Sequence, residues 1–265
     1  MLELLFQKQL TLDQTSMPLE IDRGEVEKYY YPLALRLLNM GNRHKRILVA
    51  VAGPPGSGKT AFATLLVAVI NAQAKREEAV LIQQDGWHYP NIYLDSHTVF
   101  HNSVEMPLRQ LKGCPETYDT DAAYQFLKTI KAGGQMDYPV YSRKMHDPIP
   151  NTGRITPDHH IIVLEGNYWL LQEDPWCQFL PLIDERIFLS ASAENLIDGL
   201  RQRHLRGGKT VEFIQSHMDI VDIPNIERVL KHSASAQVLV HKIDNRHISR
   251  IDYDVDTQPQ NLESD

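Results

Sequence analysis

The sequence has 265 residues, of which 42% are hydrophobic, and a formal net charge of −7 at pH 7. The chain is long enough for one large α/β domain or two small ones. No apolar run approaches the roughly 18 residues of a membrane-spanning helix, and the basic residues are too scattered to favour nucleic acid as a ligand. The two cysteines and the lack of a secretory signal pattern at the start predict a cytoplasmic protein.

Residues 1–45 predict an N-terminal helical extension with few chemically active side chains. Apolar residues recur at helical spacing from Glu25 to Met40, and Gly41 is a typical stop. We expect this helix to pack outside the core.

Five short apolar runs predict strands that are buried on both faces of a parallel sheet. They lie at residues 46–52, 79–82, 160–164, 186–189 and 237–240. Helical patterns separate several of them, at residues 60–72, 121–131, 193–206 and 211–221. This alternation predicts an α/β fold, a three-layer sandwich around a parallel sheet of about five strands.

The main domain is predicted over residues 46–250, and residues 251–265 are expected to form a polar tail. Residues 86–159 are too long and too rich in turns for a plain connection. An insertion of this kind usually carries substrate contacts, so we expect it to bind the acceptor of any reaction.

A phosphate-binding loop is predicted between the first strand and the helix that follows it. The segment Gly53-Pro54-Pro55-Gly56-Ser57-Gly58-Lys59-Thr60 matches the pattern Gly-x-x-x-x-Gly-Lys-Thr. Its glycines let successive backbone N–H groups point at phosphate oxygens, and the helix beginning near Lys59 adds its positive end. Lys59 can reach the β- and γ-phosphates, and the Thr60 hydroxyl can bind Mg²⁺. The sequence therefore predicts a P-loop NTPase that holds ATP·Mg.

A GTPase would need an Asn/Thr-Lys-x-Asp element that reads guanine. The nearest match, His241-Lys242-Ile243-Asp244, has histidine in the first position, and no suitably placed Asp-x-x-Gly switch element accompanies it. These differences disfavour a GTPase.

Two acidic residues stand at the ends of predicted strands, where ligands bind in open parallel sheets. Asp85 follows the second strand, and Glu165 follows the third. One carboxylate near the γ-phosphate can accept the proton of an attacking hydroxyl, and a second can hold Mg²⁺. Position alone leaves open whether each residue instead caps the turn after its strand.

The whole set of motifs resembles the uridine kinase, phosphoribulokinase and bacterial pantothenate kinase family over roughly residues 46–245. Besides the P-loop, the matching segments are Gln84-Asp85-Gly86-Trp87-His88-Tyr89, Gly113-Cys114-Pro115-Glu116-Thr117-Tyr118-Asp119, Tyr138-Pro139-Val140-Tyr141-Ser142-Arg143, Glu165-Gly166, and Arg201 with Arg206-Gly207. The phrase Glu165-Gly166-Asn167-Tyr168-Trp169-Leu170-Leu171 is similar to a less characterised bacterial branch, named nucleoside/nucleotide or fructose-type kinases. The resemblance implies an ATP- and Mg²⁺-dependent kinase with a small-molecule acceptor. Relatives commonly form dimers or larger assemblies, so a homodimer is compatible with the resemblance, but the sequence does not fix the oligomeric state.

Carried over by position, the resemblance implies Asp85 as the general base for the acceptor hydroxyl. Glu165 is implied, together with Thr60, as a partner of Mg²⁺. Arg201 and Arg206 are implied as residues of a helical lid, over residues 193–225, that closes on the phosphates.

Other positions in the same motifs have plainer interpretations. Arg203 lies on a different side of the lid helix, and a solvated helix face is the alternative for all of its arginines. Asp119 favours a helix N-cap, and the segment Asp222-Ile223-Pro224-Asn225 favours a structural turn.

The resemblance leaves the acceptor open. Uridine kinases have a ribose-binding aspartate where Gly113 stands, and the usual Arg-Asp pair of the lid reads Arg201-Gln202. Both departures disfavour a nucleoside, whereas residues 113–119 and 141–147 are closer to pantothenate kinases.

Candidate acceptor contacts come from the insertion, and they are Trp87, His88, Tyr89, Tyr141 and Arg143. Aromatic rings can hold a sugar or a pantothenate-like chain, and Arg143 with Lys144 could hold an anionic group. For Lys144 and His146 a solvated loop is equally favoured. His88, His101, His146, His159 and His160 do not have zinc-ligand spacing, so we do not expect them to form a zinc site.

Three functions follow in order of preference. The first is an ATP-dependent kinase acting on a hydroxyl of a nucleoside, a sugar or a pantothenate-like molecule. The second is a nucleotide-gated regulatory ATPase, which would turn over ATP without an acceptor. The third is a nucleoside monophosphate kinase, for which Arg143 and Lys144 are the candidates for a second phosphate site.

Overall fold

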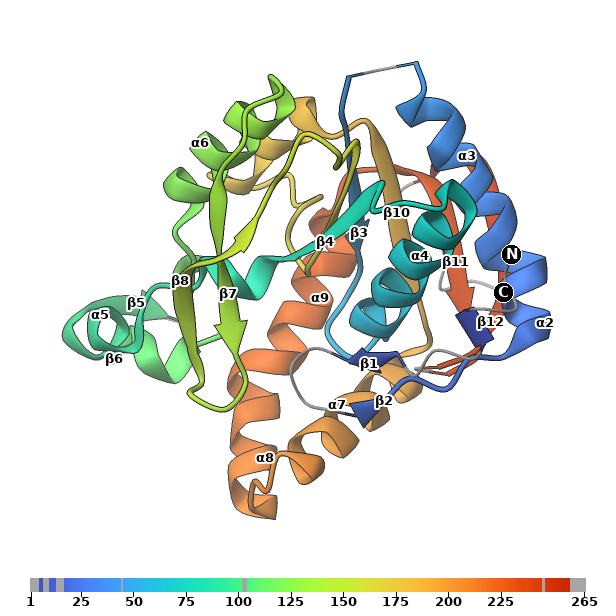
Figure 1. The fold of residues 1–265 in the computed structure, drawn as a ribbon. Helices are drawn as coiled ribbons and strands as arrows, with labels where there is room; N and C mark the ends of the chain where they lie inside the picture. The colour runs from blue at the N-terminus through green and yellow to red at the C-terminus, as the bar shows by residue number, and fades with distance from the viewer. Residues whose placement is uncertain are drawn as a thin grey trace.

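A six-stranded sheet forms the centre of the molecule in our computed structural model, which describes residues 5–6, 10–12, 17–43, 45–101, 104–244 and 246–257. The strand order is β12-β11-β10-β3-β9-β4 (Figure 1). The strands are β3 (Ile47–Ala52), β4 (Ala79–Gln83), β9 (Ile161–Glu165), β10 (Glu185–Ser190), β11 (Ala236–Lys242) and β12 (Ile248–Thr257). The first five run parallel, as predicted, and β12 pairs antiparallel with β11.

Strand β12 differs from the prediction, which ended the main domain at residue 250 and began a polar tail at 251. Residues 251–257 instead extend the sheet, and Val240 pairs with Ile251 and Val238 with Tyr253. Apolar and polar residues alternate along this edge strand, so it lacks the continuous apolar run by which the buried strands were found. Residues 258–265 lie outside the described part of the chain.

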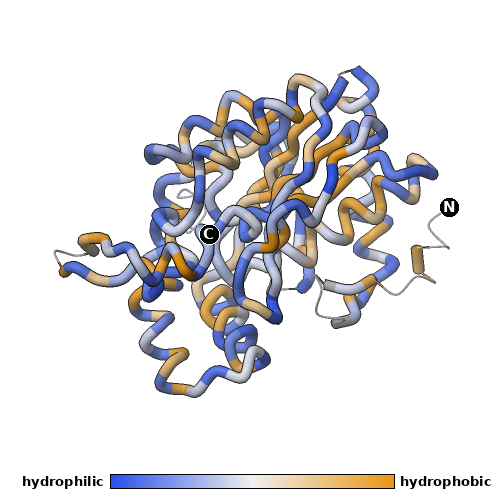
Figure 2. Tube along the Cα trace, turned by 60° about the vertical axis from the view of Figure 1, so that its left-hand side comes forward, coloured by the Kyte–Doolittle hydropathy of each residue, from blue (hydrophilic) through white to orange (hydrophobic). Residues whose placement is uncertain are grey.

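The parallel strands bury both of their faces, because alternate side chains enter two different core clusters. In β3, residues 47, 49 and 51 belong to one cluster, and residues 48, 50 and 52 belong to the other. Figure 2 shows the resulting concentration of hydrophobic residues on the central strands.

The first face of the sheet is covered by α4 (Lys59–Ala74) and by the helical stretch α2 (Arg23–Glu25), η1 (Val26–Tyr30) and α3 (Tyr31–Gly41). Val26, Leu33 and Leu37 are fully buried in the same cluster as the strands. The expectation that this helix packs outside the core was therefore wrong. A two-stranded ribbon, β1 (Thr11–Leu12) with β2 (Met17–Pro18), precedes it.

The second face is covered by α6 (Thr120–Lys131), η5 (Trp176–Leu182) and α9 (Ile223–His232). Asp119 caps α6 as predicted, since its carboxylate accepts a hydrogen bond of 2.9 Å from the Ala122 N–H. These two helical layers complete the predicted three-layer sandwich.

The remaining elements lie near the carboxyl ends of the strands or project from the body. The insertion contains η2 (Gln84–Trp87), α5 (Asn91–Ser96), the hairpin β5 (Thr98–His101) with β6 (Val104–Pro107), η3 (Leu108–Leu111), η4 (Pro115–Thr117), and the hairpin β7 (Asp137–Ser142) with β8 (Asp147–Arg154). In Figure 1, α5 and its hairpin project to the left.

The lid region consists of α7 (Ala193–Arg206), α8 (Val211–His217) and the π-helical turn η6 (Met218–Asp222), which leads directly into α9. The turn expected at Asp222–Asn225 is therefore helical, and that interpretation was wrong. In Figure 1, α7 and α8 lie below the carboxyl ends of the central strands. Among the described residues, none of the helices is both long and apolar enough to cross a bilayer.

Candidate active site

The loop Gly53–Thr60 lies between β3 and α4, in the context that a phosphate-binding loop requires. Gly56 and Gly58 have φ angles of +87° and +80°, which favour glycine. A side chain on Gly56 would overlap the backbone oxygen of Leu196 in α7, so the loop is packed directly against the lid helix. Ser57 Oγ is buried and has no hydrogen-bond partner among the described residues, which leaves a hydroxyl available to a ligand.

Lys59 begins α4 and is buried, with 6% of its surface exposed. Its Nζ donates a hydrogen bond of 2.8 Å to the Pro54 carbonyl within the loop. Burial lowers the pKa of Lys59 to about 8, although the nearby carboxylates of Glu165 and Asp85 act to raise it. Both predicted strand-end acids therefore lie within electrostatic reach of the loop lysine.

Glu165 ends β9 and is 8% exposed. It is level with Gln83, the last residue of β4, and with Val51 in β3, so its carboxylate lies at the edge from which the P-loop also leaves the sheet. Thr60 lies on the first turn of α4, next to Lys59. A hydroxyl and a carboxylate are oxygen ligands of the kind that Mg²⁺ prefers, so Thr60 and Glu165 fit a magnesium site.

Asp85 lies in η2, directly after β4. Its carboxylate accepts hydrogen bonds from the Tyr118 hydroxyl at 3.3 Å and from Arg143 at 3.4 Å. Burial acts to raise the pKa of Asp85, but the positive charges of Arg143 and Arg203 and the hydrogen bond from Tyr118 outweigh burial and lower the pKa. Asp85 is therefore a carboxylate at neutral pH, with its oxygens held towards the insertion.

His88 and two tyrosines form an aromatic wall beside Asp85. The His88 ring lies 3.9 Å from the Tyr118 ring and 5.5 Å from the Tyr141 ring, measured between centroids. Its Nδ1 donates to the Asp85 carbonyl at 2.9 Å, and its buried Nε2 has no hydrogen-bond partner among the described residues. Burial lowers the pKa of His88, so the ring is neutral at pH 7 and Nε2 can accept a hydrogen bond.

The predicted acceptor residues do not all gather at this wall. His88, Tyr141 and Arg143 surround Asp85, whereas Trp87 is 7% exposed and packs on Phe126 in the core, with ring centroids 5.1 Å apart. Tyr89 stacks on Tyr93 of α5 at 4.3 Å, on the side of the projecting hairpin.

Lys144 and His146 are exposed on the β7–β8 turn. The sequence did not single out Lys112, yet this lysine, and not Lys144, lies beside the predicted acceptor residue Tyr141. Its Nζ is 5.1 Å from the centroid of the Tyr141 ring. The sequence singled out only the neighbouring Gly113, which stands where uridine kinases have a ribose-binding aspartate.

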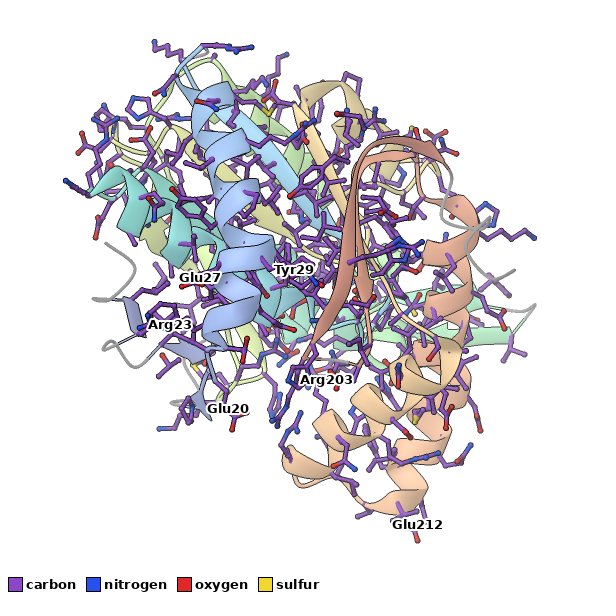
Figure 3. The ribbon with its side chains drawn as sticks, turned by 90° about the vertical axis from the view of Figure 1, so that its right-hand side faces the viewer. Glu20, Arg23, Glu27, Tyr29, Arg203 and Glu212 are labelled. Carbon is purple, nitrogen blue, oxygen red and sulfur yellow. The ribbon has the colours of Figure 1, made fainter. Side chains whose placement is uncertain are left out.

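The arginines of α7 face different surroundings. Arg201 pairs with Asp198 of its own helix at 3.7 Å, and Arg206 is exposed. Arg203 instead acts electrostatically on both Lys59 and Asp85, as its contributions to their pKa values indicate. Figure 3 shows Arg203 on the side of the lid region nearest the sheet, while Glu212 marks the far end.

Asp222 holds the inner end of this lid together. Its buried carboxylate bonds to His204 Nε2 at 2.7 Å and lies 3.7 Å from Arg203. Burial acts to raise the pKa of Asp222, but its bond to His204 and the charge of Arg203 lower the pKa on balance. Because Asp222 lies in a separate helical turn, 19 residues after Arg203, no local sequence pattern linked the two.

A phosphate-binding loop at the carboxyl end of a parallel sheet, with a buried lysine and two carboxylates beside it, defines a P-loop protein of the phosphotransferase kind. The sequence profile described as "Phosphoribulokinase / Uridine kinase family" matches residues 48–249. The chain belongs to this family and is a P-loop kinase of small metabolites.

The chain is also similar to individual proteins over most of its length. The chain is 29% identical over 234 residues to the "Uncharacterized protein YggC" of Escherichia coli, covering 88% of this chain and 94% of that one. It is 28% identical to "Putative uridine kinase C227.14" of Schizosaccharomyces pombe, covering 86% and 96% of the two chains. Among solved structures, the "putative fructose transport system kinase" of Silicibacter sp. TM1040 matches with a TM-score of 0.67 and 26% identity, covering 78% of this chain and 97% of that one.

Proposed function

We propose that this kinase transfers the γ-phosphate of ATP to a hydroxyl of its small-molecule acceptor, with Asp85 as the general base. The observation that carries the proposal is the position of the Asp85 carboxylate. It lies within electrostatic reach of Lys59 in the phosphate-binding loop, and it faces the aromatic wall of the insertion. In the reaction the acceptor oxygen bonds to the γ-phosphorus, its proton passes to Asp85, and the bond between the γ-phosphorus and the bridging oxygen breaks to release ADP.

The residues of the phosphate-binding loop, from Gly53 to Thr60, would hold the triphosphate through backbone N–H groups, the Ser57 hydroxyl and Lys59. Thr60 and Glu165 would hold Mg²⁺, which neutralises charge on the β- and γ-phosphates when it is bound. Lys59 would offset the charge that develops on the transferred group.

The lid would supply further positive charge. Arg203 acts on Lys59 and Asp85 in this structure, which supports it as a contact to the transferred phosphate. Arg201 and Arg206 remain proposals as lid residues, and both would need the lid to move inward before they could reach the phosphates.

The acceptor would lie between Asp85 and the aromatic wall. Tyr141, Arg143 and the open Nε2 of His88 are the proposed contacts. Trp87 and Tyr89 remain proposals as acceptor residues, although the former packs in the core and the latter stacks on α5. A cytoplasmic location and a homodimeric assembly also remain predictions.

ADP release from ATP·Mg, measured with a panel of nucleosides, nucleoside monophosphates, sugars, pantothenate and glycerate, tests the proposal. We expect one acceptor class to stimulate release, and Asp85→Asn to lower kcat by about 10²- to 10⁴-fold, the usual contribution of a general base. ATP binding by the variant should stay within about threefold of the parent, because the change removes no predicted phosphate contact.

Two results would contradict this function. Acceptor-independent ATP turnover, unaffected by every compound, would favour the nucleotide-gated ATPase, and stimulation by nucleoside monophosphates alone would favour a monophosphate kinase. Loss of ATP binding in Asp85→Asn would instead make Asp85 a structural residue.

A further inference from the structure

Lys112 places a positive charge beside the Tyr141 ring, within electrostatic reach of Asp85. It lies in the loop between η3 and η4, and its side chain is only 16% exposed. The side chain is half-buried, and this burial costs its ammonium part of its hydration. Burial lowers the pKa of Lys112 to about 8, so the ammonium is still mostly charged at pH 7.

The partners of this ammonium are mostly uncharged. Its Nζ donates to the Asn91 side-chain oxygen at 2.6 Å and to the His146 carbonyl at 2.7 Å. The nearest carboxylate, Asp147, is 3.9 Å away, and its Oδ1 already accepts a hydrogen bond of 2.9 Å from the Asn91 N–H. The positive charge of Lys112 is therefore held in place without a close ion pair.

The backbone that carries Lys112 is fixed by the core. The next residue, Gly113, has a φ of +108°, and its carbonyl accepts from the Tyr168 hydroxyl at 2.6 Å and from Asn225 at 3.3 Å. Such support is typical of a side chain whose position matters to a site.

A second cation lies against the same tyrosine ring. The Arg143 guanidinium carbon is 5.8 Å from the centroid of the Tyr141 ring, and the Lys112 Nζ is 5.1 Å from it. Both charges act on His88, beside the proposed general base. Arg109 adds positive potential from further out, since its charge also acts on Lys112 and Tyr141.

We propose that Lys112 and Arg143 form an anion-binding subsite over Tyr141, and that the acceptor is a small hydroxy compound carrying a carboxylate or phosphate group. This inference rests on the proposed function and names its substrate class. The anion would bind to the two cations and so place the hydroxyl at Asp85, on the His88 side of the ring. A neutral sugar or nucleoside would leave the half-buried ammonium with Asp147, at 3.9 Å, as its nearest counter-charge.

The test compares acceptors in matched pairs that differ only in the anion: glycerate with glycerol, pantothenate with pantothenyl alcohol, and fructose 6-phosphate with fructose. We expect at least one anionic member to exceed its neutral partner about tenfold or more in kcat/KM. The first two pairs report a carboxylate acceptor and the third a phosphorylated one. Lys112→Met should raise KM for that anion by about 10- to 100-fold, the usual loss for a hydrogen bond to a charged group. Lys112→Arg should retain most of the preference.

Lys144→Met is the matched control, because Lys144 is exposed next to Arg143 and should be dispensable. Acceptor-independent ATPase activity and the unfolding transition verify that Lys112→Met is folded. Equal or better use of the neutral partners, or an equal loss in Lys112→Met and Lys144→Met, would overturn the subsite.

Acceptor binding, measured by calorimetry with a non-hydrolysable ATP analogue, separates this inference from the proposed function. Preferential binding of an anion without its phosphorylation would support the subsite and count against the proposed transfer of phosphate to that anion. Absence of binding by all six compounds would overturn the subsite, and phosphorylation of a neutral member alone would overturn the subsite while supporting the function.

Discussion

At the scale of single residues, Lys59 has to remain charged in a buried position before it can neutralise phosphate. Burial lowers its pKa to about 8, well under the ordinary value of 10.5. Bound phosphate would favour the protonated form, so ATP binding should be strongest below pH 8. It should weaken as the pH rises through that value, approaching tenfold per pH unit.

Calorimetry between pH 7 and 9.5 measures this dependence, and proton uptake on ATP binding should appear above pH 8. Lys59→Arg is the control, because arginine stays charged over this range and should flatten the profile. Equal slopes for the parent and Lys59→Arg would contradict the assignment of the titration to Lys59.

The three arginines of α7 give a second prediction at this scale. Arg203→Gln should lower kcat by about 10²-fold or more, because a charge that acts on Lys59 and Asp85 can stabilise the transferred phosphate. Arg201→Gln should cost less, since Arg201 pairs with Asp198 of its own helix. A larger loss in Arg201→Gln would indicate that α7 rotates when the lid closes.

Asp222→Asn tests whether Asp222 acts through Arg203. If it orients that arginine, the double variant with Arg203→Gln should be no slower than Arg203→Gln alone. Additive losses would instead indicate two independent roles. The unfolding transition of each variant is measured together with kcat. A purely structural loss would lower the stability of the variant, whereas a loss of orientation would lower kcat alone.

At the scale of elements, the phosphate-binding loop depends on its contact with the lid helix. Gly56→Ala should destabilise the fold by about 3 kcal/mol or more and abolish ATP binding, because the new methyl group would overlap the Leu196 carbonyl in α7. Gly208→Ala is the matched control: its φ is +71°, but no atom lies within 4 Å of the new methyl group. It should cost only about 1 kcal/mol. Urea unfolding and ATP binding measure both, and similar losses would contradict a role for the loop–lid contact.

The elements that the sequence predicted are those whose signal is local. Parallel strands such as β3 and β9 are buried on both faces and therefore appear as unbroken apolar runs. The P-loop was found because its glycines and lysine are adjacent in the sequence. Strand β12 was missed because an edge strand carries polar residues on alternate positions, and its partner β11 is defined only by the fold.

The site residues divide in the same way, into those with a local sequence signal and those that only the fold brings together. Asp85 and Glu165 could be predicted because each directly follows an apolar run. Lys112 could not, because its place beside Tyr141 depends on the folding of two segments 29 residues apart. The sequence placed Arg203 on a different side of the lid helix but could not assign its role. Helical periodicity gives the relative faces of α7, but it does not tell which face meets the P-loop.

At the scale of the whole molecule, Arg36 links the N-terminal helix α3 to the sheet, including its C-terminal strand β12. From α3 it donates to Glu185 in β10 and to Asp254 in β12, each at 2.8 Å. The Glu185 side chain is only 3% exposed. Burial raises the pKa of Glu185, and Arg36 opposes that rise. Removing Arg36 would therefore leave a carboxylate in the core without its closest cation.

Arg36→Met should lower the free energy of unfolding by about 2–4 kcal/mol at pH 7, somewhat less than for a fully buried pair because Arg36 is 30% exposed. The sign of the pH dependence follows from Glu185. Without Arg36 its pKa rises further, so acid protonates it in the folded state and removes the unpaired charge. The destabilisation by Arg36→Met should therefore shrink between pH 7 and pH 5.

Arg250→Met is the control for this prediction, because Arg250 and its partner Asp252 are 62% and 40% exposed. An exposed pair of this kind should contribute less than about 1 kcal/mol at either pH. Urea unfolding of both variants at the two pH values gives the comparison. Equal losses would mean that Arg36 acts only as a surface charge. A loss that is larger for Arg36→Met and that falls with acid would make the buried Glu185 contact the link through which α3 and β12 stabilise the sheet that carries the site.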